Sequence, residues 1–142
     1  FMAKEELFRV PLLGQAITLY GAYPVKRVSG DRAAIRAAIA SLENGWATGV
    51  FLQGARTPDG CITEHKLGAA LIAAKTNAPL LPVSLWGTHA ILPKGAKSLH
   101  LYPVTVRIGK PIPAPTNSDR ATLEALTEKC AAEINALHAL GR

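Results

Sequence analysis

The sequence has 142 residues, 49% hydrophobic and 18% charged, a balance that excludes a disordered chain and fits one globular domain with a substantial core. The net charge of +6 favours an anionic partner, but the basic residues are scattered without interleaved aromatics, which argues against nucleic-acid binding. The two cysteines, Cys61 and Cys130, are far apart and indicate neither a disulfide framework nor a zinc site, as is typical of intracellular proteins.

The first third of the chain is predicted to hold three helical pieces and one strand. Residues 3–19 are expected to be helical in two pieces, interrupted around Pro11 and Gly14. Residues 23–27 are expected to form a short strand, at whose start or on whose edge Pro24 can be tolerated. The clearest helix spans residues 31–44 and ends at Gly45. Its apolar stripe consists of Ala34, Ile35, Ala38, Ile39, Leu42 and Trp46.

The remainder is predicted to alternate between strands and helices. Buried strands are expected at residues 48–52 and 80–85, with a helix at 66–76 between them. A strand is expected at 102–108 with Val104, Val106 and Ile108 on one face. The last helix runs from residue 118 or 119 to about 140. Its buried stripe is formed by Leu123, Leu126, Cys130, Ile134 and Leu137.

This order of elements predicts an α/β fold with a mostly parallel sheet flanked by helices. The sequence contains no internal repeat and no sign of a second domain, so residues 1–142 are expected to form a single domain. The longest apolar stretch, residues 68–86, is interrupted by a lysine, an asparagine and two prolines, and is not a membrane span.

The loop at residues 51–60, with the sequence FLQGARTPDG, is the strongest candidate for a binding site. It leaves the carboxyl end of a predicted buried strand, where open α/β sheets bind their ligands. Gly54 lets the backbone approach a ligand, and Arg56 offers a planar fork of donors suited to phosphate. The alternative is a surface turn with a solvated arginine.

Three cations beside turns or strand ends could form a phosphate pocket near Gly54. They are Lys4, Arg27 and Arg56, and the alternative is that they are unrelated surface charges. None of the four histidines is followed five positions later by an aspartate, and no cluster has the spacing of metal ligands. His65 and His89 flank the possible site loops and are the two to mutate.

Four segments together resemble the 1-acylglycerol-3-phosphate acyltransferase family, the phosphatidic-acid-forming enzymes of glycerolipid synthesis. Residues 3–14 (AKEELFRVPLLG) are similar to the segment that follows the family's first motif. Residues 21–27 (GAYPVKR), 51–57 (FLQGART) and 78–83 (APLLPV) are similar to its second, third and fourth motifs. The resemblance covers nearly all 142 residues, and the order of the motifs makes it fairly specific.

The resemblance implies a glycerolipid acyltransferase-like fold and a membrane-associated transferase of phospholipid biosynthesis. The acyl chain would pass from acyl-CoA or acyl carrier protein to lysophosphatidic acid, without a further cofactor or metal. Arg27 and Arg56 would hold the acceptor phosphate, Lys4 would assist, and Gln53 and Gly54 would shape the loop beneath it. By this resemblance the protein would lie at the cytoplasmic face of a membrane. It would be bound peripherally or anchored by a segment that precedes the domain.

Two departures from the family pattern bear on activity. The first motif, His-x-x-x-x-Asp, supplies the family's general base and the carboxylate that orients it, and it is absent from these 142 residues. We expect this motif upstream of Phe1, which makes the domain incomplete at its amino terminus and the chain alone inactive. Gln53 stands where the family usually has glutamate. The alternative function is a non-catalytic module that binds lipid phosphate or a membrane surface.

Overall fold

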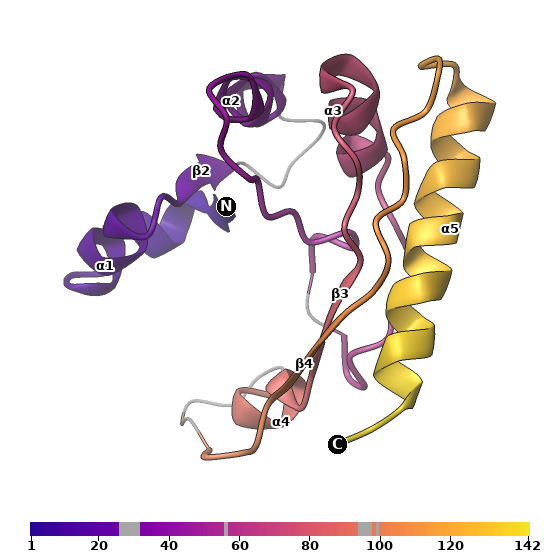
Figure 1. Cartoon of the computed structure of the whole chain (residues 1–142). Helices are drawn as coiled ribbons and strands as arrows, with labels where there is room; N and C mark the ends of the chain where they lie inside the picture. Colours follow the sequence, from indigo (N-terminus) through magenta and orange to yellow (C-terminus); the bar gives the residue numbers. More distant parts are fainter. Residues whose placement is uncertain (26–31, 56, 94–97, 99) are drawn as a thin grey trace. The chain divides into compact units, whose positions relative to one another are not determined.

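A computed structural model describes residues 1–25, 32–55, 57–93, 98 and 100–142 (Figure 1). These residues form two compact units, Phe1–Phe51 and Leu52–Arg142. Each unit combines helices with a two-stranded sheet, so the predicted α/β class is confirmed. That residues 1–142 form a single acyltransferase-like domain stays a prediction.

The first unit is built on a parallel pair of strands. Strand β1 (Met2–Lys4) pairs with β2 (Tyr23–Val25), and Ala3 lies opposite Pro24. Parallel strands need a long crossover connection, which here contains the 3₁₀ helix η1 (Glu5–Arg9) and helix α1 (Leu13–Leu19). The expected strand near residue 23 is confirmed over its first three residues.

The predicted helix at residues 3–19 is partly wrong. Its first residues belong to β1, and the interruption lies at residues 10–12, around Pro11. Gly14 is inside α1 and buried rather than at the break. A Cβ at this position would collide with the carbonyl oxygen of Phe8, so Gly14 is needed for close packing of α1 on η1.

Helix α2 (Arg32–Glu43) agrees with the predicted helix, and Gly45 follows it at φ +81°. Ala34 and Ala38 are its buried residues, whereas the isoleucines of the predicted stripe are half-buried. Trp46 is 72% exposed, because the helix has ended before it reaches this residue. The small side chains, and not the large ones, therefore make the closest contacts of α2.

The predicted strand at residues 48–52 is wrong, since residues 46–51 belong to no helix or strand and Leu52 lies in a bend. The carbonyl oxygen of Gly49 accepts one hydrogen bond from the Met2 N–H, at 3.2 Å. Phe51 is exposed and only Leu52 is buried. An apolar run of four residues predicted burial, but it does not specify the hydrogen-bonded neighbours that make a strand.

The second unit is built on an antiparallel pair. Strand β3 (Val83–Trp86) pairs with β4 (Thr105–Ile108), and the short helix α4 (Thr88–Ile91) follows β3. Helix α3 (Gly68–Thr76) precedes them and ends at Asn77, which is left-handed with φ +52°. Both predicted strands are shorter than expected, and the predicted helix at 66–76 begins two residues late.

Helix α5 (Arg120–Ala139) covers one face of this sheet and also packs on α3. Ser84 and Arg107 pair on the covered face. Val106 and Ile108 share a face, as predicted, but that face is exposed, together with Val83 and Leu85 of β3. The predicted stripe of α5 is confirmed at Leu123, Leu126 and Cys130, whereas Ile134 and Leu137 are half-buried. Its buried residues are Leu123, Leu126, Thr127, Cys130, Ala131 and His138.

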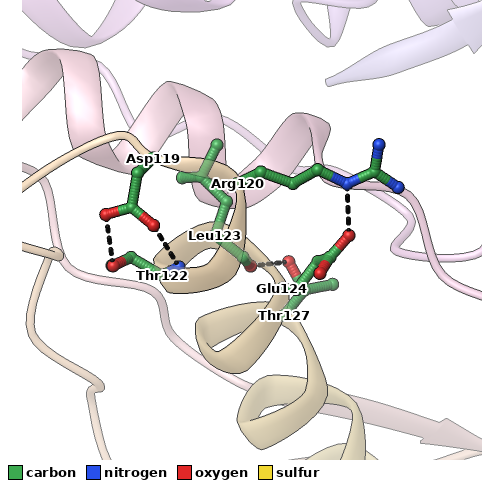
Figure 2. Close-up of polar contacts among 6 residues, drawn as sticks. All are labelled: Asp119, Arg120, Thr122, Leu123, Glu124 and Thr127. Atoms are coloured by element: carbon green, nitrogen blue, oxygen red, sulfur yellow. Dashed lines mark hydrogen bonds and ion pairs between the residues drawn. The ribbon is translucent and has the colours of Figure 1, made fainter.

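The start of α5 is capped as the sequence predicts. Figure 2 shows the Asp119 carboxylate accepting hydrogen bonds from the Thr122 N–H at 2.9 Å and from its hydroxyl at 2.8 Å. These bonds lower the pKa of Asp119, the backbone bond contributing most. Arg120 and Glu124 form an ion pair of 2.7 Å one turn apart.

Candidate functional site

The candidate loop of the second unit is closed at its base by its own polar groups. The side-chain oxygen of Gln53 accepts a hydrogen bond from the Thr63 N–H at 3.0 Å. The carbonyl oxygen of Leu52 accepts another from the Lys66 N–H, also at 3.0 Å. These two hydrogen bonds hold the beginning and the end of the loop together. Gln53 makes its bond with a neutral side chain.

Gly54 lies at the closed base in a left-handed conformation, with φ +70°. A Cβ built on this residue would lie 3.8 Å from Nζ of Lys66. The Lys66 side chain therefore extends over Gly54, and it is exposed to solvent. The sequence analysis missed Lys66 as a site residue, although it expected a helix to begin at this lysine. The backbone at a glycine with φ above zero, together with a neighbouring ammonium group, can bind an anion.

The tip of the loop is the Asp59-Gly60 turn. The Asp59 carboxylate accepts a hydrogen bond from the Cys61 N–H at 3.0 Å, forming an Asx turn. This bond is the main reason that the pKa of Asp59 lies below its usual value. Burial raises the pKa of the Cys61 thiol, with a further contribution from the Asp59 charge. Gly60 completes the turn in a left-handed conformation, with φ +83°.

Lys4 lies at the end of β1 in the first unit, half-exposed. Its ammonium group forms an ion pair with Glu6 at 3.1 Å. This partner is two residues away in sequence, and it must be replaced or shared if Lys4 contacts a phosphate.

The predicted convergence of Lys4, Arg27 and Arg56 stays a prediction. Arg27 and Arg56 lie outside the described residues. Within the described part of the second unit, the cation that the structure brings to Gly54 is Lys66.

Two residues of α5 hold the loop, and the sequence analysis missed both. Asn135 and His138 form hydrogen bonds to the backbone of Ile62 and Asp59. Both lie beside the predicted apolar stripe of α5. A polar side chain next to that stripe was the sequence signal that could have identified them. Of the two histidines singled out from sequence, His89 has its ring 6.3 Å from that of His138, with its Nδ1 buried and unpaired among the described residues. His65 has no polar contact of this kind with the residues that the structure describes.

No group of three or more metal-ligating side chains occurs within residues 1–25, 32–55, 57–93, 98 and 100–142. Across the same ranges, no helix combines the length and apolar character needed to cross a bilayer. Trp86 packs on Tyr102, with 5.9 Å between the ring centroids. Burial raises the pKa of Tyr23, whose hydroxyl is buried without a partner among the described atoms.

The sequence matches the family model described as Acyltransferase over residues 1–86. This match covers more than half of the chain and includes Lys4, Gln53, Gly54 and Lys66. The chain therefore belongs to the acyltransferase family, as the resemblance of its motifs implied.

The chain is also similar to individual acyltransferases. The chain is 34% identical over 115 residues to the chloroplastic 1-acyl-sn-glycerol-3-phosphate acyltransferase BAT2 of Brassica napus, covering 79% of this chain and 33% of that protein. It is 34% identical over 87 residues to the 1-acyl-sn-glycerol-3-phosphate acyltransferase of Bacillus subtilis (strain 168), covering 61% and 43%.

A solved structure is similar over almost the whole chain. The crystal structure of the 1-acyl-sn-glycerophosphate (LPA) acyltransferase PlsC from Thermotoga maritima matches with a TM-score of 0.76 and 33% identity. The match covers 99% of this chain and 56% of PlsC. The expected glycerolipid acyltransferase-like fold is confirmed by this match, and the chain spans about a third to just over half the length of these three relatives.

Proposed function

We propose that the protein transfers an acyl chain from acyl-CoA or acyl carrier protein to lysophosphatidic acid, giving phosphatidic acid. The observation that carries this proposal is the 34% identity to BAT2 over 79% of the chain, because that relative is named for this reaction. The similarity of the fold to that of PlsC also supports the proposal.

The reaction needs an acceptor held by its phosphate and a base for its free hydroxyl. The base takes the hydroxyl proton as that oxygen attacks the thioester carbonyl. The carbon–sulfur bond breaks, and the protonated base gives the same proton to the departing thiolate. The family resemblance assigns the base to the histidine of a His-x-x-x-x-Asp motif, which residues 1–142 do not contain. The present residues would therefore supply acceptor binding.

Gly54 and Lys66 form the described part of the proposed acceptor site. Gly54 is left-handed and carries no side chain, and the Lys66 ammonium beside it offers charge to the phosphate. By the family resemblance Arg27 and Arg56 complete the site, with Lys4 assisting. Gln53 keeps the loop closed, which preserves a role that the family's usual glutamate can also perform.

The test is binding and turnover by the purified 142 residues. We expect saturable binding of a short-chain lysophosphatidic acid, much weaker binding of the matching lysophosphatidylcholine, and no phosphatidic acid after addition of acyl-CoA. Turnover by this chain would contradict the assignment of the base to an upstream motif. Equal binding of both lipids would contradict a site for a phosphate monoester.

The second candidate function is a non-catalytic module that binds lipid phosphate. It is favoured by Gln53, because a binding module does not need the charge of the family's usual glutamate. The intact mass of the protein isolated from its source cells distinguishes the two. A longer chain that carries the motif supports the enzyme, and a mass equal to that of residues 1–142 supports the module.

A membrane surface is the proposed location of either activity, at the cytoplasmic face, and helix α1 supports it. Gly14 packs α1 on η1, while Leu19 of the helix is 88% exposed and its flanking residues Leu12 and Tyr20 are 80% and 83% exposed. Leu12, Leu13, Ala16, Leu19 and Tyr20 recur at spacings of three and four and form one apolar face. Residues 11–25 carry no charge, whereas Arg9 and the net charge of +6 suit an anionic surface.

A further inference from the structure

A pair of hydrogen bonds joins α5 to the candidate loop across 73 residues of sequence. Nδ2 of Asn135 donates to the carbonyl oxygen of Ile62 at 2.9 Å, and Oδ1 of Asn135 accepts from the Ile62 N–H at 2.8 Å. One side-chain amide thus satisfies both backbone groups of one residue, as a neighbouring β-strand would. This geometry fixes the orientation of the Asn135 amide.

His138, one helical turn further along, holds the tip of the loop. Its Nε2 lies 3.0 Å from the carbonyl oxygen of Asp59. Because a carbonyl oxygen only accepts, Nε2 carries the hydrogen. Nδ1 lies 3.4 Å from Oγ of Ser84, so in the neutral ring it accepts from that hydroxyl. His138 is 7% exposed and Ser84 is 1% exposed, which makes these bonds costly to leave unmade.

Gly60 is shaped to this contact. A Cβ at position 60 would lie 2.6 Å from Cε1 and 2.8 Å from Nε2 of His138. The left-handed φ and the close approach to the imidazole both require glycine. The turn of the loop and the side chain of α5 therefore fit one another closely.

The loop is consequently held at two levels. Gln53 and Leu52 close its base through Thr63 and Lys66, and α5 holds its far side through Asn135 and His138. The base is where Lys66 lies over Gly54. Without the contacts from α5, the segment between residues 54 and 62 would sample many conformations, and binding would have to order it.

We infer that Asn135 and His138 are positioning residues of the acceptor site, which hold the loop in the shape that receives the phosphate of the acceptor. This inference rests on the proposed function. Neither residue needs to touch the lipid, since a loop fixed before binding pays no ordering entropy when the ligand arrives.

The experiment combines amide hydrogen exchange with binding of a short-chain lysophosphatidic acid to the 142-residue chain. In Asn135→Ala we expect exchange at Ile62 to accelerate at least about tenfold and affinity to fall about tenfold. Glu128→Ala, an exposed change on the same helix, should alter neither. The His138→Gln variant should bind lysophosphatidic acid more tightly than the His138→Ala variant, because glutamine can still donate a hydrogen bond to the Asp59 carbonyl oxygen.

The outcomes separate this inference from the proposed function. Faster exchange with unchanged affinity overturns the positioning role and leaves the acceptor site in place. Unchanged exchange at Ile62 in Asn135→Ala overturns the contact itself. If the unmodified chain binds lysophosphatidylcholine as tightly as lysophosphatidic acid, the proposed acceptor site fails and the positioning role fails with it, whatever the exchange shows.

Discussion

The side-chain oxygen of Gln53 accepts a hydrogen bond from the backbone N–H of Thr63, ten residues later in the chain. This bond explains how glutamine can occupy a position where the family usually has glutamate. Either side chain offers an oxygen of the same reach to the same N–H. Closure of the loop therefore depends on an acceptor at residue 53 and not on its charge.

Gln53→Glu should leave the loop closed, whereas Gln53→Ala should open it. The alanine variant loses about 1 kcal/mol of hydrogen bonding. We expect faster amide exchange at Thr63 in the alanine variant and unchanged exchange in the glutamate variant. Rapid exchange in both would show that charge or side-chain detail at this position matters more than the acceptor oxygen.

Lys66→Ala should weaken the binding of lysophosphatidic acid about tenfold, since it removes a charged partner of a phosphate. Calorimetric titration with a short-chain lysophosphatidic acid measures this change. Lys75→Ala is the matched control, because Lys75 is an exposed lysine in the last turn of α3. Its replacement lowers the net charge by one, as Lys66→Ala does. Equal losses in both variants would indicate a general effect of charge and no local site.

Gly60→Ala should lower the free energy of unfolding by at least about 2 kcal/mol, through the left-handed backbone and the collision with His138. Gly45→Ala provides the comparison, since Gly45 has a similar φ of +81° and open space around it. It should cost only about 1 kcal/mol. Chemical denaturation of both variants gives the difference.

The double variant Gly60→Ala/His138→Ala tests the contact itself. Removing the imidazole relieves the collision, so the two changes should cost less together than the sum of their separate costs. Strict additivity would mean that the loop already moves away from His138 in the single variant.

The cap of α5 should make stability depend on pH in the acid range. The pKa of Asp119 is lower in the folded chain than its usual value near 4. Its contribution is therefore complete above that usual value and is lost as the pH falls through the lowered one. Asp119→Asn keeps an acceptor for Thr122 and should flatten this part of the profile of melting temperature against pH. An unchanged profile would assign the acid sensitivity to other carboxylates.

Leu19→Gln should weaken the binding of the chain to vesicles of anionic phospholipid, since it places an amide on the exposed face of α1. Co-sedimentation with vesicles measures this. Leu12→Gly is informative in a second way, because Leu12 has φ +64° and glycine relieves that conformation. It should weaken vesicle binding while the chain becomes more stable. Unchanged binding in both variants would contradict a role of this face at the membrane.

The sequence predicted the elements that have strong periodicity. The α5 stripe and the body of α2 follow from apolar spacing over three or more turns, which few other structures satisfy. Residues 48–52 were predicted as a strand because a short apolar run resembles one. Whether such a run acquires a ladder depends on neighbours that lie far away in the sequence.

The candidate site was predicted in part for the same reason. Gly54 and the Asp59-Gly60 turn lie in a glycine-containing loop that the sequence identifies, and both glycines are left-handed in the structure. Asn135 and His138 were not predicted, because their function arises from contacts across 73 and 79 residues. A polar residue beside an apolar stripe identifies a buried hydrogen bond but not its partner.

The distance in sequence between the loop and its holders also sets an order of assembly during synthesis. Gln53 meets Thr63 as soon as the loop has been made, so the base can close early. Asn135 and His138 are translated last of all these parts, in the final turns of α5. A nascent chain therefore carries a loop that is closed but not yet fixed. On the ribosome the binding surface would remain unfinished until α5 has emerged and folded back onto β3 and β4.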